Sequence, residues 1–258
     1  MTRPLEQFDE ARRLHELGLN NCEISRRLGI PRVTIRDWVD PRLQAARTAR
    51  ALLRPSRDCQ RCLGTEDLLG PDYVYLLGLY LGDGHLGCSQ KGVWRLRISQ
   101  DQRYPGLIAE CRLAMSAVTT SRVAVQRCLG CVAINAWWKH WIHLFPQHGP
   151  GLKYRRRIVM EPWQTALIDR FPAQLIRGLI HSDGCRSMNN ITRRWSGRCA
   201  NYSYPRYEFS NASADIRLLF TATCEQLGVH WTRLTERNLA ISRKKDVALL
   251  DTFIGPKC

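Results

Sequence analysis

A repeat within the chain constrains its fold more than any other feature. The segment 176–185 aligns without a gap with the segment 76–85, one hundred positions earlier. Each copy is an apolar run with small residues four positions apart, and each ends in Asp-Gly. A chain that carries two copies of one unit is expected to fold as two similar halves. The matched pairs are Gly78 and Gly178, Gly82 and Ser182, Asp83 and Asp183, and Gly84 and Gly184.

The same order of predicted elements follows each copy. After the first, periodicity predicts strands near 93–99, 122–127 and 131–135 and helices over 105–117 and 137–145. After the second, it predicts strands near 204–210, 229–235 and 238–242 and helices over 213–227 and 244–253. Both halves follow the plan helix, two strands, helix, two strands, helix, which is an α+β fold. Repeat 1 is expected at 72–146 and repeat 2 at 173–258, joined by a basic linker at 147–172.

This pattern resembles that of the single-chain, two-repeat LAGLIDADG homing endonucleases. The resemblance covers roughly residues 72–257 and rests on the two spaced Asp-Gly motifs and the element order. It implies two αββαββα repeats that form a pseudo-dimeric saddle over the major groove, in a monomer. The implied function is that of a site-specific endonuclease that hydrolyses both strands of double-stranded DNA.

The small residues of the motif predict how the two halves meet. Residues four apart lie on one face of a helix, and small side chains there let two helix backbones approach closely. The two motif helices are therefore expected to pack on each other at the centre of the pseudo-dimer. Gly84 and Gly184 follow the helices, where a left-handed backbone is expected because glycine adopts it at little cost.

Asp83 and Asp183 are the candidate catalytic and metal-binding residues. Each is predicted at the last position of its helix, where the negative end of the helix dipole disfavours a carboxylate. A divalent cation between them would explain this placement, and magnesium with its preference for oxygen ligands is the expected ion. A helix-stop Asp-Gly without a site is the alternative for either copy alone. The resemblance implies the same two acids, with Gly82 and Ser182 as further candidate ligands.

The resemblance also implies a basic residue near each active site, at the end of the fourth strand. The second repeat offers Arg243 and Lys244 there, and Lys244 is the catalytic candidate. The first repeat has Asn135-Ala-Trp137 at the matching stretch. The two halves therefore differ, and asymmetric cleavage, nicking and loss of activity all stay open.

The charge of the chain favours a polyanionic partner. The formal net charge is +16, from 39 Lys and Arg against 23 Asp and Glu, and arginine outnumbers lysine. Such a balance is typical of nucleic-acid binding. No run of apolar residues is long enough for a membrane span, and the start lacks an apolar signal region. With 11 cysteines, an odd number, a disulfide framework is not expected, and the expected location is the cytoplasm.

Residues 1–45 predict a helix-turn-helix domain of three short helices. Ile24, Leu28, Ile35 and Trp38 match the facing ridges of this unit, and Gly29 matches the turn. The segment resembles the helix-turn-helix of resolvases and transposases. Such a unit presents its third helix to the major groove, which makes Arg32 and Arg36 candidate DNA contacts beside Val33. A small three-helix bundle with a basic surface is the alternative.

Further candidate DNA contacts lie on predicted strands and in the linker between the repeats. Alternation places Arg95 and Arg97 on one face of a strand, and Arg206 on the matching face in the second repeat. The resemblance implies that this polar face reads base edges and phosphates; a solvated sheet face is the alternative. The remaining candidates are Lys153, Arg155 and Arg156 of the linker and Arg243.

Two Cys-x-x-Cys pairs raise the alternative of a structural zinc site. Cys59 and Cys62 lie in a predicted linker, 46–71, and Cys128 and Cys131 lie between two predicted strands. Two such pairs supply the four thiolates of a tetrahedral site, but zinc pairs are usually much closer in sequence. Free thiols, or a plain hairpin turn around Gly130, are the alternatives. His140, His143 and His148 lie among tryptophans and are assigned structural roles.

Three functions compete on this sequence. The first is the metal-dependent DNA endonuclease, which the retention of both acids favours. The second is a catalytically inactive, sequence-specific transcriptional regulator on the same scaffold. A recombinase is the third, and it rests on the amino-terminal helices alone.

Overall fold

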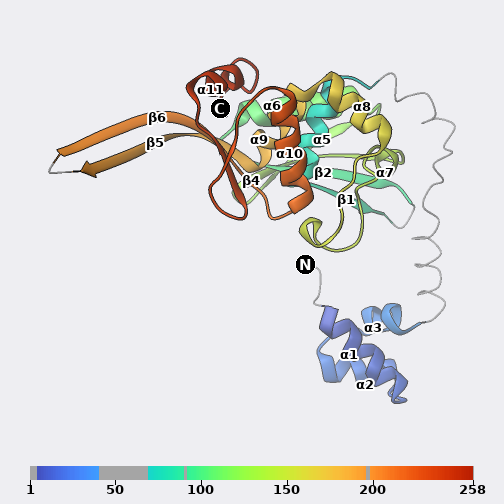
Figure 1. Ribbon diagram of the computed structural model, residues 1–258. Coiled ribbons are helices and arrows are strands. Elements are labelled where there is room, and N and C mark those ends of the chain that lie inside the picture. The colour runs from blue at the N-terminus through green and yellow to red at the C-terminus, as the bar shows by residue number, and fades with distance from the viewer. Residues whose placement is uncertain (1–4, 41–68, 90–91, 196–197, 258) are drawn as a thin grey trace. The chain divides into compact units, whose positions relative to one another are not determined.

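The computed structural model describes residues 5–40, 69–89, 92–195 and 198–257 (Figure 1). The chain divides into two compact units, one formed by the amino-terminal helices and a larger one formed by the two repeats. Cys59 and Cys62, and almost all of the predicted linker 46–71, lie outside the described residues. None of the described helices is long and apolar enough to cross a membrane.

The amino-terminal unit consists of α1 (Leu5–Glu16), α2 (Asn21–Leu28) and α3 (Arg32–Val39). Asn20 caps α2 through the backbone N–H groups of Cys22 and Glu23, and the Glu23 carboxylate accepts the Asn20 N–H in return. Gly29 turns the chain between α2 and α3 with φ of 64°. The helices enclose a small apolar core of Ala11, Leu14, Ile24, Ile30, Ile35 and Val39.

Each half of the larger unit has the predicted order of two strands between successive helices, and the fold is α+β. Repeat 1 contains α5 (Pro71–Asp83), β1 (Gly84–Cys88), β2 (Trp94–Asp101), α6 (Pro105–Val118), β3 (Val123–Cys128), β4 (Cys131–Trp138) and α7 (Trp141–Leu144). Repeat 2 contains α9 (Pro172–Asp183), β5 (Gly184–Trp195), β6 (Arg198–Ser210), α10 (Ala214–Gln226), β7 (Thr232–Arg233), β8 (Asn238–Ile241) and α11 (Lys244–Asp251). The two antiparallel sheets have the matching orders β1-β2-β4-β3 and β5-β6-β8-β7.

One predicted helix is much shorter than expected. The helix predicted over 137–145 is only α7, because β4 continues to Trp138 and pairs with β2 along its whole length. The ladder from Cys131 opposite Asp101 to Trp138 opposite Trp94 keeps these aromatic residues in the sheet. Aromatic side chains favour such half-buried strand positions.

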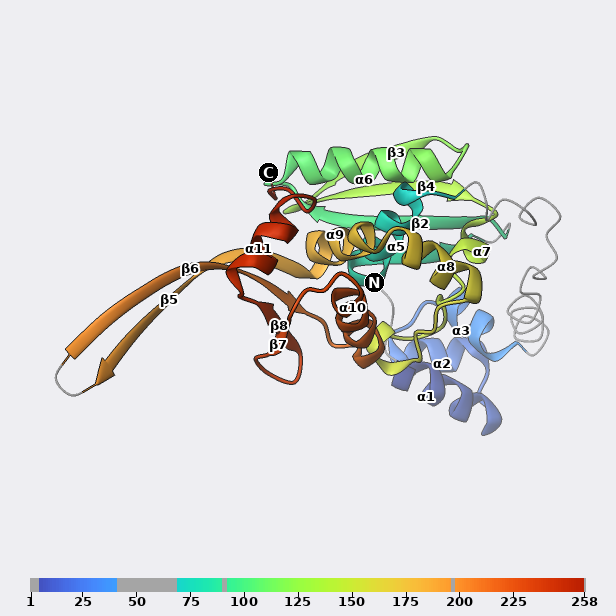
Figure 2. The ribbon, with the colours of Figure 1, turned by 45° about the horizontal axis from the view of Figure 1, so that its top comes forward.

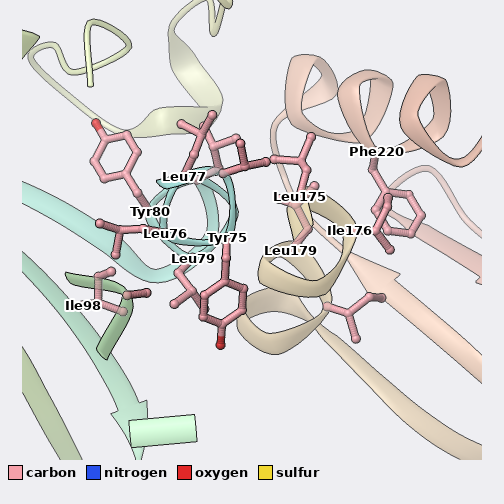
Figure 3. Packing of buried hydrophobic residues seen from close by; sticks show 14 of the residues in the cluster. Tyr75, Leu76, Leu77, Leu79, Tyr80, Ile98, Leu175, Ile176, Leu179 and Phe220 are labelled. Carbon is pink, nitrogen blue, oxygen red and sulfur yellow. The ribbon is translucent and has the colours of Figure 1, made fainter. Parts of the chain in front are cut away.

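The motif helices α5 and α9 pack on each other at the centre of the larger unit, as their small residues predict (Figure 3). A Cβ atom added to Gly78 would lie 2.8 Å from the Gly178 Cα atom, and one added to Gly82 would collide with the Ser182 side chain. The apolar side chains beside this contact, including Leu76, Leu79, Leu175 and Leu179, are fully buried. The two helices are thus fixed in register with one another, and so are their last residues.

This close approach predicts the cost of a single added methyl group. Gly178→Ala is expected to lower the free energy of unfolding by about 2 kcal/mol, because the helix backbones must move apart to admit it. The added Cβ would lie 2.9 Å from the Gly78 Cα atom. Urea denaturation followed by circular dichroism measures the change. Gly87→Ala is the control, since its added Cβ meets nothing closer than 3.9 Å; equal stability of the two variants would contradict the packing argument.

The glycines that follow the motif helices do not have the predicted left-handed backbone. Gly84 has φ of −81° and Gly184 φ of −119°, and both are extended. Glycine is required there for close approach: a Cβ on Gly84 would lie 2.5 Å from the Tyr80 Cα atom, and one on Gly184 would lie 2.8 Å from the Glu208 carbonyl oxygen. In each repeat the chain therefore passes directly from the motif helix into a strand.

The linker between the repeats folds back over the end of α5. It contains a short 3-10 helix, η2 (Lys153–Arg155), and α8 (Pro162–Arg170). Buried Gln164 donates hydrogen bonds to the Tyr73 hydroxyl at 2.7 Å and to the Leu144 carbonyl at 3.3 Å. The Tyr73 hydroxyl itself donates to Leu144 at 2.7 Å. These bonds hold the linker against α5 and α7.

Repeat 2 departs from repeat 1 in the length of its first hairpin. Strands β5 and β6 pair from Gly184 opposite Phe209 to Trp195 opposite Arg198, whereas β8 pairs only with Tyr207–Ser210. The rest of the hairpin projects from the sheet as a two-stranded ribbon (Figure 2). Cross-strand hydrogen bonds join Asn189 to Tyr204 at 2.7 Å and Thr192 to Asn201 at 2.8 Å along it.

Candidate functional site

Asp83 and Asp183 lie at the last positions of α5 and α9, beside one another. The contact of Gly82 with repeat 2 brings them together: a Cβ on Gly82 would lie 3.0 Å from Asp183 Oδ2. The charge of Asp183 also raises the pKa of Asp83, as expected for two neighbouring carboxylates. The duplicated motif therefore delivers one acid from each repeat to a shared site.

Asn211 orients the second of these acids. Its side-chain amide donates a hydrogen bond of 2.5 Å to Asp183 Oδ2 and, through its Oδ1, accepts from the Ser213 backbone N–H at 2.7 Å. Ser213 is the N-cap residue of α10. The start of α10 thus holds the Asp183 carboxylate in one orientation, with the other oxygen left for a further partner.

A lysine lies at the carboxyl end of each motif helix. The ammonium of Lys153 donates to the carbonyl oxygens of Tyr80, of Leu81 at 3.1 Å and of Gly82 at 2.9 Å. Lys257 donates in the same way to the carbonyl of Gly184, after α9. A cation is favourable at this end of a helix because the last carbonyls have no partner within it. Each lysine therefore offsets the negative end of one helix dipole.

These four charged groups act on one another. Removal of solvent and then the charge of Asp183 raise the pKa of Asp83 to about 6, while Lys153 and Lys257 oppose the rise. Removal of solvent also raises the pKa of Asp183, against the hydrogen bond from Asn211 and the same two lysines. Burial lowers the pKa of Lys153 to about 8 and also lowers that of Lys257. The site therefore contains two carboxylates and two ammonium groups, whose opposite charges partly offset one another.

The raised pKa of Asp83 predicts a change of stability with pH. Its pKa is 3.8 in an ordinary environment and about 6 in the folded protein, so between these values the folded state binds more protons than the unfolded state. The free energy of unfolding is therefore expected to fall as pH rises from about 4 to about 6, by about 1 kcal/mol because part of the side chain remains in water. Urea denaturation across this range measures it. Asp83→Asn should remove this component, and an unchanged pH profile in that variant would contradict the assignment.

The donor set suits a hard divalent cation. Magnesium binds through one or two carboxylates and completes its shell with water and substrate phosphate oxygens. Asp83 and the free oxygen of Asp183 meet that requirement, and the described residues contain no group of three or more His, Cys, Asp or Glu that would suit another metal. The Gly82 carbonyl already accepts from Lys153. The Ser182 hydroxyl bonds back to Gly178 and Leu179, both at 3.0 Å, so the two acids are the stronger candidates.

Arg243 and Lys244 follow the end of β8 (Asn238–Ile241), where the sequence analysis placed them. Lys244 begins α11, and both residues are exposed. The cations whose charges act on Asp83 and Asp183 are instead Lys153 and Lys257. A cavity of about 300 Å³ has Asp83, Ser182 and Lys257 among its lining residues. Lys257 is therefore a basic residue of repeat 2 that lies beside the acids, and the catalytic role of Lys244 stays a prediction.

The sheet of repeat 1 has a polar outer face with two arginines. His85 pairs with Arg97, so the two side chains lie on the same face, and Arg95 follows two positions away. The Arg95 guanidinium lies over the ring of Trp137, 5.2 Å from its centroid. Arg97 contacts the Cys128 sulfur at 3.6 Å. This half therefore offers two half-buried guanidinium groups on the same face of the sheet as His85, each in contact with a neighbouring side chain.

The matching face of repeat 2 is closer to neutral. The Arg206 guanidinium forms an ion pair with Glu208 at 2.9 Å, and the Ser187 hydroxyl donates to the same carboxylate oxygen at 2.7 Å. At the base of the hairpin, Arg186 pairs with Asp251 at 2.8 Å. The two halves of the sheet surface thus differ in free positive charge.

The other sequence candidates lie at the surface or in the linker. Arg32 and Arg36 are exposed on α3, next to Val33, and Arg155 is exposed on η2. Arg156 lies in the linker, where it donates to the carbonyls of Gln147 and Gly151. Cys128 and Cys131 face each other across the turn between β3 and β4 as free thiols.

Sequence reasoning missed Lys257 and Asn211. Lys257 lies six residues past α11, and Asn211 lies between a strand and a helix, so neither belongs to a periodic pattern. The charge of Lys257 and the cap-like segment Asn211-Ala-Ser213 were the available signals. Both residues reach the end of α9 only when the chain folds, because they belong to segments far from α9 in the sequence.

No protein-family model and no curated protein matches the chain. Among solved structures, it is similar to the N-terminal LAGLIDADG domain of DUF199/WhiA at 17% identity, covering 73% of this chain and 82% of that chain, with a TM-score of 0.44. It is similar to I-DmoI in complex with DNA and Mn at 15% identity, covering 73% and 98%, with a TM-score of 0.45. It is similar to full-length DUF199/WhiA from Thermatoga maritima at 18% identity, covering 72% of this chain and 55% of that chain, with a TM-score of 0.46. These are similarities of fold at low sequence identity.

Proposed function

We propose that this protein is a site-specific endonuclease of double-stranded DNA that uses a divalent cation held by Asp83 and Asp183. The observation that carries the proposal is the meeting of these two acids at the ends of two closely packed helices, beside a basic sheet face. Two neighbouring carboxylates repel each other and repel DNA phosphate, so a role in binding DNA alone gives no reason to keep both.

The residues around the acids have separate roles in the proposed hydrolysis of DNA. Bound magnesium supplies positive charge at the phosphate under attack. Asp83 and Asp183 would hold that ion, and Asn211 orients Asp183. Lys153 and Lys257 place two ammonium groups next to the acids, where they favour negative charge on the phosphate. Arg95 and Arg97 bind the backbone of the strand that crosses repeat 1.

Two further parts of the chain would extend the contact with DNA. The exposed Arg32 and Arg36 of α3 suit a helix that enters the major groove. The ribbon of β5 and β6 carries arginines and no Asp or Glu from Gly184 to Arg206, and a two-stranded ribbon fits the same groove. The net charge of +16 supports binding through phosphate along this length.

A DNA-binding regulator without cleavage is the second candidate. It is favoured by the two lysines, which already balance both carboxylates, and by the bond from Lys153 to the Gly82 carbonyl. In that case the four charged groups would serve to hold the halves together.

The deciding experiment first selects, from a randomised library of duplex DNA, the targets that the full chain binds. These targets are then incubated with the full chain and magnesium. Magnesium-dependent cuts at a fixed position, abolished by EDTA, are expected for the endonuclease. Specific binding without cuts in any selected target would instead support the regulator. Absence of specific DNA binding would overturn both.

A further inference from the structure

A cavity of about 260 Å³ lies beside Asp83 in repeat 1, apart from the cavity that contains the carboxylate itself. Gly82 and Gly84 form one wall, at the passage from α5 to β1, and the linker segment 148–153 with Arg156 forms the other. Four of its lining residues are glycines, which leave backbone rather than side chains at the surface. The cavity therefore has room for a small ligand close to the candidate metal site.

The side chains that line this cavity are basic or neutral, and none is a carboxylate. They include His85, His148, Lys153 and Arg156. Arg156 is fixed in the wall by hydrogen bonds to the carbonyl of Gln147 at 3.1 Å and to that of Gly151 at 2.9 Å. Those bonds use two of the five N–H donors of a guanidinium, so others stay available to a ligand. The lining favours an anion.

The aromatic residues of the wall hold these donors in place. His148 packs edge-on against Trp94, with ring centroids 5.2 Å apart, and lies 6.2 Å from the ring of His85. The Tyr80 hydroxyl points away from the contact of α5 with α9 (Figure 3), and the charge of Arg156 acts on it. Imidazole and phenol groups donate hydrogen bonds to phosphate oxygens as guanidinium does.

We propose that this cavity binds one phosphate group of the DNA backbone, next to the Asp83 carboxylate. This inference rests on the proposed function and adds to it a site present in one half of the protein. The residue of repeat 2 that matches His85 is Cys185, which has no comparable donor, and the linker with His148 and Arg156 covers repeat 1. The strand that crosses repeat 1 is thereby held by a contact that its complement lacks.

The test titrates inorganic phosphate into the full chain and follows the histidine ring resonances by NMR. The signals of His85 and His148 are expected to shift together with a single dissociation constant. Arg156→Gln and His148→Phe are each expected to weaken phosphate binding by about tenfold, because each removes donors to a charged ligand. Arg157→Gln is the matched control: it removes the same charge one position along, from a side chain that is 86% exposed and lies near Asp215.

The source of the phosphate is decided by repeating the titration on a complex with duplex DNA. If a backbone phosphate fills the cavity, saturating DNA should abolish the shifts caused by inorganic phosphate. Shifts that persist on the DNA complex would overturn the assignment to the backbone, and equal affinity of wild type, Arg156→Gln and His148→Phe would overturn the site. Phosphate binding without DNA cleavage would leave the cavity assigned and reject the endonuclease; cleavage without phosphate binding would do the reverse.

Discussion

Asp83→Asn and Asp183→Asn are each expected to lower the rate of magnesium-dependent DNA cleavage by about a thousandfold or more, which corresponds to roughly 4 kcal/mol of transition-state stabilisation. Asparagine keeps the shape of the side chain but removes the charge that holds a divalent cation. DNA affinity in EDTA is expected to stay the same or to rise, because one carboxylate no longer repels phosphate. Single-turnover cleavage of a selected target and binding without metal measure the two effects.

The two variants also separate catalysis from folding. Asp83→Asn should fold at least as stably as the wild type at pH 7, since the carboxylate it replaces has a raised pKa. Asp169→Asn is the control, because Asp169 is an exposed acid of α8 that contacts Gln226. Wild-type cleavage by either active-site variant, or an equal loss in the control, would reject a shared metal site.

The motif helices could be predicted from sequence because their information is local and occurs twice. Small residues four apart define a contact face without reference to the rest of the chain, and Gly78 meets Gly178 as that spacing predicts. The last position of each helix follows from the same ten residues, so Asp83 and Asp183 could be placed before their surroundings were known. The order of the strands followed from alternation in the same way.

The role of Gly84 and Gly184 could not be predicted, because two different physical causes favour glycine directly after a helix. Glycine after a helix is favoured by a left-handed backbone, which depends on the residue itself, or by close approach, which depends on its neighbours. Gly84 is constrained by the backbone of Tyr80, and Gly184 by β6. Only the second cause operates here, and the sequence alone does not distinguish it from the first.

The cations beside the acids could not be assigned from the sequence for a related reason. Lys153 was expected to contact DNA phosphate, and Lys257 was not singled out at all. Each reaches the end of a motif helix from a segment whose path depends on tertiary contacts, such as the bond between Gln164 and Tyr73 that holds the linker. A charge of this kind is visible in the sequence, but its partner becomes known only when the chain is folded.

Lys153→Met is expected to lower the free energy of unfolding by about 3 kcal/mol at pH 7, because it keeps the approximate length of the side chain but leaves the buried groups that the ammonium contacts without their partner. The variant leaves the carbonyls of Tyr80, Leu81 and Gly82 without their donor and leaves Asp83 with one cation fewer. Lys139→Met, an exposed lysine between β4 and α7, is expected to change stability by less than about 0.5 kcal/mol.

A double-mutant cycle divides this loss between the helix end and the acid. In the Asp83→Asn background the cost of Lys153→Met should fall by about 1 kcal/mol, because the carboxylate that the ammonium balances is gone. Urea denaturation of the four proteins at one pH gives the coupling energy. If Lys153→Met costs the same in both backgrounds, the ammonium serves only the helix carbonyls; the four charges then do not act as a unit, and a cation would bind the two acids without competing with Lys153.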